Sequence, residues 1–112
     1  MSYVQERYRE TIDYTWALAR QLDRIAEARS KLHGKVMRAE YERRLAEYRS
    51  TVYTLYMLLP PRARQRLPDP KGYSLRDLDN WVAEAIGVLD KLGLLIRKRE
   101  TLVGGDASPG DI

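Results

Sequence analysis

The sequence predicts an all-α protein: a long antiparallel helical hairpin with a third helix packed across its open end, with or without a short C-terminal strand. Two stretches before residue 60 carry apolar residues at helical spacing, and a glycine at position 34 separates them. A third amphipathic stretch follows a proline-rich segment. We expect residues 1–103 to form a single helical domain and residues 104–112 to form a flexible tail.

The first helix is expected to begin near Tyr3, because Ser2 followed by Gln5 is a capping-box pattern. Arg29 falls where an apolar residue is expected, so its side chain must pair with an acid, reach water or meet an anion. The predicted apolar stripe comprises Val4, Tyr8, Ile12, Thr15, Ala19, Leu22, Ala26 and His33, widened by Leu18, Ile25 and Leu32.

The second helix follows Gly34. Its last turns, residues 52–59, are apolar on nearly every side, which is typical of a buried helix end. Gly34 is either a tight turn or part of one continuous helix. We favour the turn, because a single rod could not bury both stripes unless it dimerised. Pro60 and Pro61 end this helix. Its predicted stripe comprises Met37, Tyr41, Leu45, Tyr48, Val52, Leu55 and Leu59.

Residues 60–74 hold four of the five prolines, which predicts a loop with one short turn near residues 62–67. Ser74 is the expected cap of a third helix, with Asp77 at the favourable third position. Gly93 ends that helix, and residues 94–103 are typical of an extended segment or a fraying helix. The inward face is expected to hold Leu75, Leu78, Trp81, Val82, Ala85, Ile86, Leu89 and Leu92.

The residue inventory indicates that this protein is not an enzyme and holds no metal or cofactor. Cysteine is absent, so disulfides and thiolate metal sites are excluded. His33, the only histidine, is expected to cap carbonyl groups at the end of the first helix. No phosphate-binding loop spacing occurs. Grouped carboxylates lie opposite the apolar stripes and are interpreted as solvated surface: Glu6, Glu10 and Asp13 in the first helix, Asp77 and Glu84 in the third.

The sequence carries no sign of membrane attachment or export. No run of apolar residues approaches the ~18 that a membrane-spanning helix needs. The first residues lack the basic start and apolar run of a secretory signal. We therefore expect a cytoplasmic protein with no membrane contact.

Positive charge is concentrated after the second helix. The net charge is +4, and residues 60–76 hold five basic side chains against one acidic side chain. Such a loop suits contact with phosphates without reading of bases. We favour a non-enzymatic helical subunit of a larger assembly that includes nucleic acid. The expected phosphate contacts are Arg62, Arg64, Arg66, Lys71, Arg76, Arg97, Lys98 and Arg99.

Two aromatic residues indicate a protein partner. Tyr14 and Trp16 lie off the stripe of the first helix, and tryptophan is enriched in interfaces. A first helix of about 30 residues also offers more surface than one small monomer covers. We expect self-association or a dedicated protein partner at these residues, unless the third helix or the proline-rich loop covers them.

The end of the third helix resembles part of a winged-helix domain, in which a recognition helix leads through glycine into a basic wing strand. The resemblance implies a DNA-binding transcriptional regulator. The outer face of this helix, however, carries Asp77, Asn80 and Glu84, which disfavour entry into the major groove. A plain protein–protein adaptor is the third alternative. The matching residues are Leu89, Leu92, Gly93, Leu94 and Ile96, followed by Arg97, Lys98 and Arg99.

Overall fold

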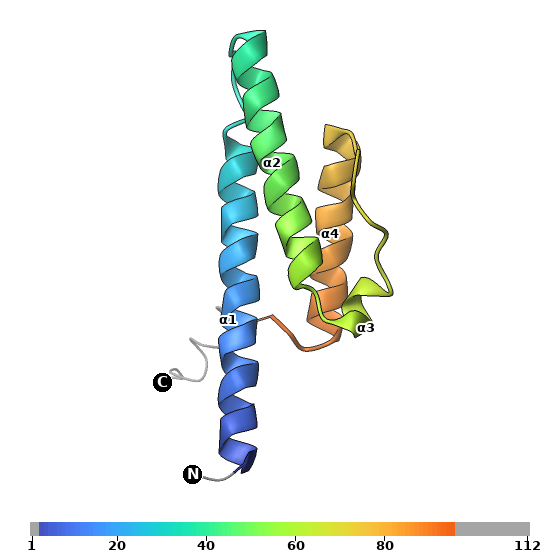
Figure 1. The fold of residues 1–112 in the computed structure, drawn as a ribbon. Helices are drawn as coiled ribbons and strands as arrows, with labels where there is room; N and C mark the ends of the chain where they lie inside the picture. Colours follow the sequence, from blue (N-terminus) through green and yellow to red (C-terminus); the bar gives the residue numbers. More distant parts are fainter. Residues whose placement is uncertain (1–2, 96–112) are drawn as a thin grey trace, which may run out of the picture.

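A computed structural model of the chain describes the backbone of residues 3–95 and the side chains of residues 14–95. The described chain forms four helices and no strand, which confirms the all-α prediction (Figure 1). Of the predicted extended segment, residues 94–103, only Leu94 and Leu95 are described, and they lie in neither a helix nor a strand; the predicted tail, residues 104–112, lies outside the described residues. The helices are α1 (Tyr3–Ser30), α2 (Arg38–Leu58), α3 (Pro61–Arg64) and α4 (Leu75–Lys91).

Helices α1 and α2 form the predicted hairpin. They run antiparallel and pack closely, except at the first turns of α1, which continue past the end of α2 (Figure 1). The connection between them spans residues 31–37, and Gly34 lies in it with a backbone φ of +84°. A residue with a Cβ would be strained in that conformation, so glycine is what allows the chain to reverse here.

Helix α4 packs on the hairpin but lies alongside α2 and runs in the same direction, rather than across the open end (Figure 1). The connection that follows α3 makes this possible, because it carries the chain back along the length of α4. Two side chains fix it in place. The Trp81 Nε1–H donates to the Pro68 carbonyl oxygen at 2.7 Å, and the Arg49 guanidinium donates to the Tyr73 carbonyl oxygen at 3.1 Å.

Both ends of α4 are capped as the sequence predicts. The Ser74 hydroxyl oxygen accepts a hydrogen bond from the Asp77 backbone N–H at 3.2 Å. At the other end, Gly93 has a φ of +70° and the Leu94 N–H donates to the Leu89 carbonyl oxygen at 2.9 Å. This is a Schellman motif, which satisfies carbonyl groups that the helix itself leaves unpaired.

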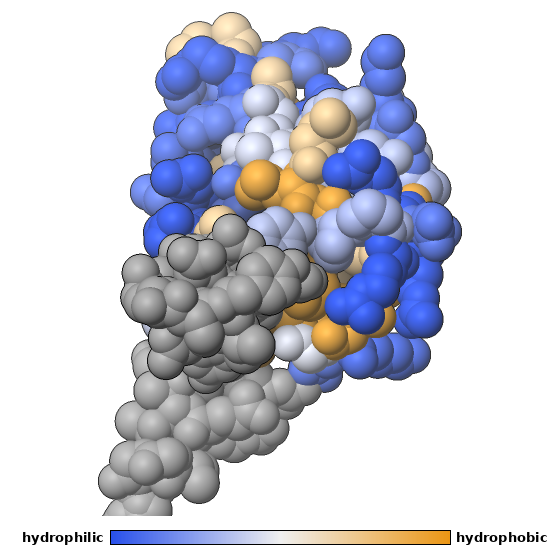
Figure 2. Space-filling view, turned by 60° about the horizontal axis from the view of Figure 1, so that its bottom comes forward, coloured by the Kyte–Doolittle hydropathy of each residue, from blue (hydrophilic) through white to orange (hydrophobic). Residues whose placement is uncertain are grey.

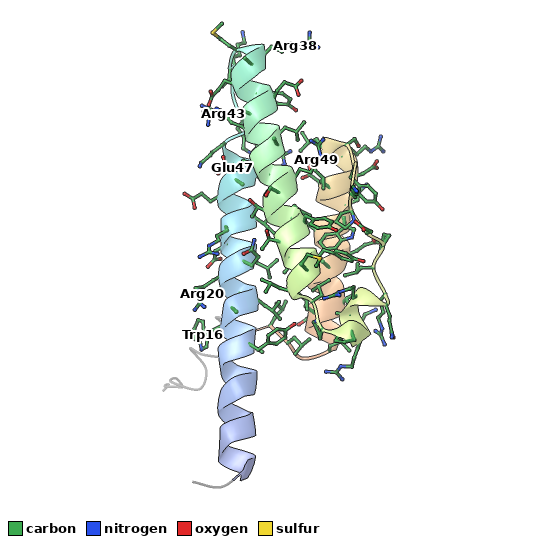
Figure 3. The ribbon with its side chains drawn as sticks, in the orientation of Figure 1. Trp16, Arg20, Arg38, Arg43, Glu47 and Arg49 are labelled. Atoms are coloured by element: carbon green, nitrogen blue, oxygen red, sulfur yellow. The ribbon has the colours of Figure 1, made fainter. Side chains whose placement is uncertain are left out.

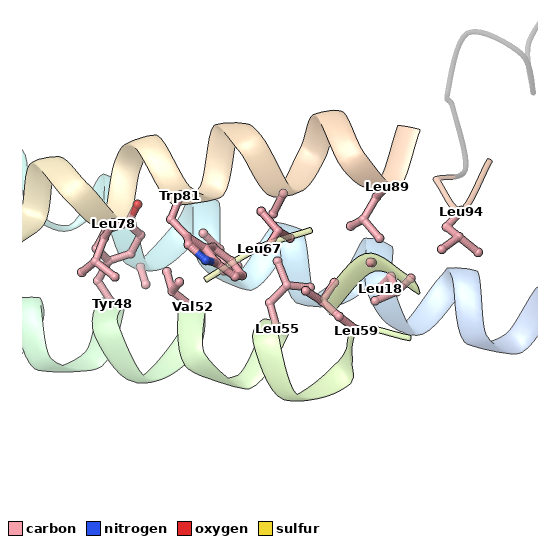
Figure 4. Packing of buried hydrophobic residues seen from close by; sticks show 14 of the residues in the cluster. Leu18, Tyr48, Val52, Leu55, Leu59, Leu67, Leu78, Trp81, Leu89 and Leu94 are labelled. Atoms are coloured by element: carbon pink, nitrogen blue, oxygen red, sulfur yellow. The ribbon is translucent and has the colours of Figure 1, made fainter. Parts of the chain in front are cut away.

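The core lies where α1, α2 and α4 meet (Figure 4). The last turns of α2 form its centre, as predicted, although Met57 points outward and is 55% exposed. Trp81 and Tyr48 are the largest fully buried side chains. Figure 2 shows hydrophobic residues gathered between hydrophilic flanks at one end of the molecule. The core comprises Leu18, Ile25, Ala28, Leu32, Tyr48, Val52, Leu55, Leu59, Ala63, Leu67, Leu78, Trp81, Ala85, Leu89 and Leu94.

The predicted stripe on α1 is wrong in its rotational setting. Ala26 and His33 are exposed, whereas Leu18, Ile25 and Leu32 form the buried centre. The reason is that α1 contacts one helix on each flank, so its buried face is centred between α2 and α4. Buried positions on that face include Gln21, which is 3% exposed because its side-chain amide donates to the Thr51 carbonyl oxygen at 3.0 Å on α2.

Two further predicted core positions are exposed. Met37 is 81% exposed because it immediately precedes α2, in the connection at the tip of the hairpin. Ile86 is 41% exposed because it lines a groove between α1 and α4. None of the helices described here combines the length and the low charge that crossing a bilayer requires.

Candidate functional site

Arg64, at the centre of the predicted basic loop, serves the fold. Its Nη2 donates to the carbonyl oxygens of Met57 and Leu59, each at 3.0 Å, and its guanidinium carbon lies 5.6 Å from the centre of the Tyr56 ring. These carbonyls end α2, and the two prolines that follow have no N–H to offer them. Arg64 therefore caps the C-terminus of α2, where a cation is also favoured by the helix dipole.

Tyr14 contributes to the same cap. Its hydroxyl donates to the Leu58 carbonyl oxygen, between the two carbonyls that Arg64 occupies. Burial raises the pKa of Tyr14, and the charge of Arg64 opposes that rise. The structure thus gives Tyr14 an intramolecular role, and we do not include it in the partner surface proposed below.

The other predicted phosphate contacts that the structure describes are exposed but divided. Arg62 and Arg66 lie in and just after α3, at the end of the bundle where α4 finishes (Figure 1). Arg76 lies in the first turn of α4, at the other end of that helix and roughly 22 Å from its last residue at 1.5 Å per residue. Lys71 lines a groove beside Arg49 and the middle of α2. The basic side chains therefore lie at three separate places rather than in one continuous patch.

Acidic side chains lie on the outer face of α4, between Arg76 at its start and the arginines near its end. Asp77 and Glu84 are exposed there, together with Asn80. Acidic side chains on this face oppose a phosphate backbone running along α4. The same residues weigh against α4 as a recognition helix. The wing of the winged-helix resemblance, with Arg97, Lys98 and Arg99, lies outside the described residues.

Trp16 is the most conspicuous exposed aromatic side chain in the part of the chain described. It is 50% exposed and points away from α2, next to Arg20 (Figure 3). Below it, the first turns of α1 continue past the ends of α2, α3 and α4 (Figure 1). The side chains of residues 3–13 are outside the description, but their helical backbone and their sequence place Val4, Tyr8, Ile12 and Trp16 on one i, i+4 row.

Arg29, the polar residue that interrupts the predicted stripe, joins three helices. Its guanidinium donates to both carboxylate oxygens of Asp79, with Nε–Oδ1 at 3.0 Å and Nη2–Oδ2 at 3.2 Å. The Tyr48 hydroxyl donates to the same carboxylate at 2.6 Å. From the sequence, three outcomes stayed open for Arg29: pairing with an acid, reaching water or meeting an anion. The structure shows the pairing, and Asp79 could not be named beforehand because no local pattern links a residue of α1 to one of α4.

The pKa values of this cluster follow from its contacts. Burial raises the pKa of Tyr48 far above its ordinary value, and the hydrogen bond to Asp79 adds to the rise. Burial also acts to raise the pKa of Asp79, but the hydrogen bonds from Arg29 and Tyr48 outweigh it, so the net shift is downward. The cluster is therefore an ionised, fully paired contact between helices, with no group poised near neutral pH for acid–base chemistry.

The remaining candidate chemical groups lie on the surface or outside the described side chains. His33 is exposed in the connection between α1 and α2. Among the described residues, no three of the histidine or acidic side chains come together in a way that would hold a metal ion. The side chains of Glu6, Glu10 and Asp13 are not described. Comparison of the chain with protein-family models, curated proteins and solved structures found no match.

Proposed function

We propose that this protein is a non-enzymatic helical subunit that assembles with a second copy of itself through α1. The observation that carries the proposal is the extension of α1 beyond the bundle, with Trp16 exposed where the extension begins (Figures 1 and 3). Most of the stability of a helix in a protein comes from the packing of one of its faces, and α2, α3 and α4 end before this extension begins (Figure 1). A partner that covers it would therefore stabilise both its structure and the assembly.

The row Val4, Tyr8, Ile12 and Trp16 supports helix-to-helix docking. Side chains at i, i+4 spacing form the ridges that fit into the grooves of a neighbouring helix. A tryptophan and a tyrosine also supply large areas of apolar surface, and both residue types are common at the energetic centres of interfaces.

The charges along the extension favour a second copy as the partner. Residues 3–13 hold two basic and three acidic side chains, interspersed along the helix. In an antiparallel pair, such a segment can meet itself without the repulsion that a single-sign helix would suffer. The basic members are Arg7 and Arg9, and the acidic members are Glu6, Glu10 and Asp13.

Sedimentation equilibrium of the full chain tests this proposal. We expect a dimer, and we expect Ile12→Glu and Trp16→Ala each to raise its dissociation constant. Met37→Glu is the matched control, since Met37 is a highly exposed apolar residue at the opposite end of the hairpin. A monomer at the highest soluble concentration would overturn the proposal, as would equal weakening by all three variants.

A second candidate, contact with nucleic-acid phosphates, is favoured by the exposure of Arg62 and Arg66. Neither forms an ion pair with any described side chain, whereas Arg64 between them is held inward by α2. Each phosphate contact adds roughly 0.9 to the slope of log affinity against log salt. Two contacts at this end of the bundle therefore predict that losing both arginines lowers the slope by about 2.

Titration of labelled single- and double-stranded oligonucleotides at several salt concentrations measures this slope. We expect Arg62→Ala with Arg66→Ala to flatten it for all sequences alike. Arg20→Ala with Arg24→Ala, two exposed arginines on α1, is the control and should leave it unchanged. Absence of binding at low salt would end this candidate for the isolated chain. Preference for one duplex sequence would favour the winged-helix regulator instead.

A further inference from the structure

A groove of about 490 Å³ lies between the middle of α2 and the turn at residues 70–73. Its volume falls within the range of roughly 300–1,000 Å³ that is typical of ligand-binding clefts. The wall is largely apolar, and its lining residues include two cations and no acidic side chain. They are Ala46, Arg49, Ser50, Tyr53, Thr54, Pro70, Lys71 and Gly72.

The turn that forms one wall of the groove is held in place by the rest of the fold. The Tyr73 N–H donates to the Pro70 carbonyl oxygen at 3.3 Å, and Gly72 has a φ of +78°. A positive φ at the third residue is typical of a type II β-turn, in which the second residue, here Lys71, lies at the tip. Pro70 is fully buried, and the Arg49 guanidinium donates to the Tyr73 carbonyl oxygen (Figure 3). The groove is therefore preformed.

The two cations of the groove differ in what they contact. Arg49 donates to the turn, whereas the Lys71 side chain is exposed and forms no ion pair with a described carboxylate. The neighbouring acid, Asp69, is not among the lining residues, and its carboxylate accepts the Lys71 backbone N–H at 3.0 Å. The grooves between α1 and α4, between α1 and α2, and between α4 and the proline-rich loop each include two acidic residues. The groove beside Lys71 is instead positively charged, which favours an anionic ligand.

Tyr53 adds an aromatic surface to the same groove. It is half-buried, and its ring centre lies 5.7 Å from that of Tyr56, which in turn lies 6.1 Å from the Trp81 ring in the core. This packing restricts the Tyr53 ring, so little side-chain entropy is lost when a flat group stacks on it. Ser50 and Thr54, both exposed, add hydroxyl groups to the lining. Together with the cation at the tip of the turn, the groove suits a ligand that carries both a flat ring and a negative charge.

We propose that this groove binds one nucleotide unit of a single-stranded nucleic acid, with its base against the Tyr53 ring and its phosphate at the Lys71 ammonium group. Proteins that bind single strands combine aromatic rings with cations, because every base has a flat face and every unit carries a phosphate. The bases of a duplex already stack on one another, so only an unpaired base is free to enter the groove.

A strand is favoured over a free nucleotide by the small number of cations at this site. Lys71 supplies a single phosphate contact, and the exposed Arg62 and Arg66 can add to it only if the ligand continues beyond the groove. The inference therefore rests on the second candidate function, contact with nucleic-acid phosphates, and it adds a base-binding site to that function.

Fluorescence anisotropy of the full chain with three labelled probes of equal length tests the proposal. The probes are a thymidine single strand, an abasic strand and a duplex. We expect the thymidine strand to bind about five- to 150-fold more tightly than the abasic strand, which is the value of one stacked base. Tyr53→Leu removes the ring and should abolish this difference, whereas Tyr53→Phe should keep it. Neither variant should alter binding of the abasic strand or the duplex, which also shows that the variants fold.

The phosphate contact has its own measurement. Lys71→Gln should lower the slope of log affinity against log salt by about 0.7 for both single strands. Lys35→Gln, which changes an exposed lysine at the tip of the hairpin, is the control and should leave the slope unchanged.

The possible failures are distinguishable. If Tyr53→Leu keeps the preference for bases, the base site is wrong, while phosphate contact at Arg62 and Arg66 stands. If the wild type binds none of the probes at low salt, the second candidate function fails and the base site fails with it. Displacement of the thymidine strand by an equal nucleotide concentration of thymidine monophosphate would overturn the strand in favour of a free nucleotide. Equally effective displacement by polyglutamate would overturn the nucleotide in favour of an acidic peptide.

Discussion

Removing the Asp79 carboxylate is expected to destabilise the protein by about 2–3 kcal/mol. Asp79→Ala leaves the hydroxyl of Tyr48, a residue that is 2% exposed, without its 2.6 Å acceptor. An unsatisfied buried polar group costs about 1–3 kcal/mol. The variant also unpairs Arg29, but the side chains of Arg29 and Asp79 are 31% and 38% exposed. Water therefore replaces much of that interaction, and we count it at no more than about 1 kcal/mol.

Chemical denaturation of the variants measures this loss. Tyr48→Phe should cost about 1 kcal/mol, since it removes one hydrogen bond but leaves Asp79 paired with Arg29. In the Tyr48→Phe background, Asp79→Ala should cost about 1 kcal/mol less than in the wild type, because no buried hydroxyl is then stranded. Glu84→Ala, an exposed carboxylate on the same helix, is the control. A loss below about 0.5 kcal/mol for Asp79→Ala would refute the reasoning, because that is the range of ordinary surface substitutions.

The same cluster predicts a pH dependence of stability. The pKa of Asp79 is lower in the folded state, so its contribution is present above the unfolded value near 4 and is lost as the pH falls through the folded pKa. The pKa of Tyr48 is raised, so its contribution is lost as the pH rises above about 10. Asp79→Asn should flatten the acid side of the stability profile, and Tyr48→Phe should flatten the alkaline side.

Further stability measurements check the cap, the core and the final turn. Arg64→Ala should cost about 1–3 kcal/mol by exposing the carbonyl ends of α2, whereas Arg62→Ala should stay within about 0.5 kcal/mol. Leu18→Ala should cost about 3–5 kcal/mol, because Leu18 is fully buried. Leu22→Ala should cost clearly less, because Leu22 is only half-buried. If Leu22→Ala cost more than Leu18→Ala, the stripe predicted from the sequence would be right after all. Gly93→Ala should cost about 1 kcal/mol through its positive φ, although an added Cβ meets no atom there.

The elements of the fold were predictable because each has local signals in the sequence. Apolar residues recur at helical spacing, Ser74 and Gly93 mark the ends of α4, and the paired prolines end α2. The turn at Gly34 followed from the need to bury two stripes. These signals act over a few residues, and the structure bears them out at nearly the expected positions.

The rotational setting of α1 and the direction of α4 were not predictable in this way. Both depend on which helices become neighbours, and the sequence between residues 60 and 74 does not encode how far that connection reaches. Ala26 has the right chemistry and spacing for a core position but faces water. Gln21 has the wrong chemistry but is buried, because a carbonyl of α2 lies opposite it.

The candidate site shows why the arginines of this chain are a poor guide to function when read from sequence alone. Arg29, Arg49 and Arg64 each satisfy acceptors on another element, so their charge is committed to the fold. Arg62 and Arg66 have no such acceptor among the described side chains and remain available to a partner. Arg64 makes the distinction clear, because it sits between them in an unbroken alternation. It differs from them in donating to carbonyl groups at the end of α2, which the prolines leave without backbone donors. A basic run therefore indicates a phosphate-binding surface only after the carbonyl groups that require capping have been accounted for.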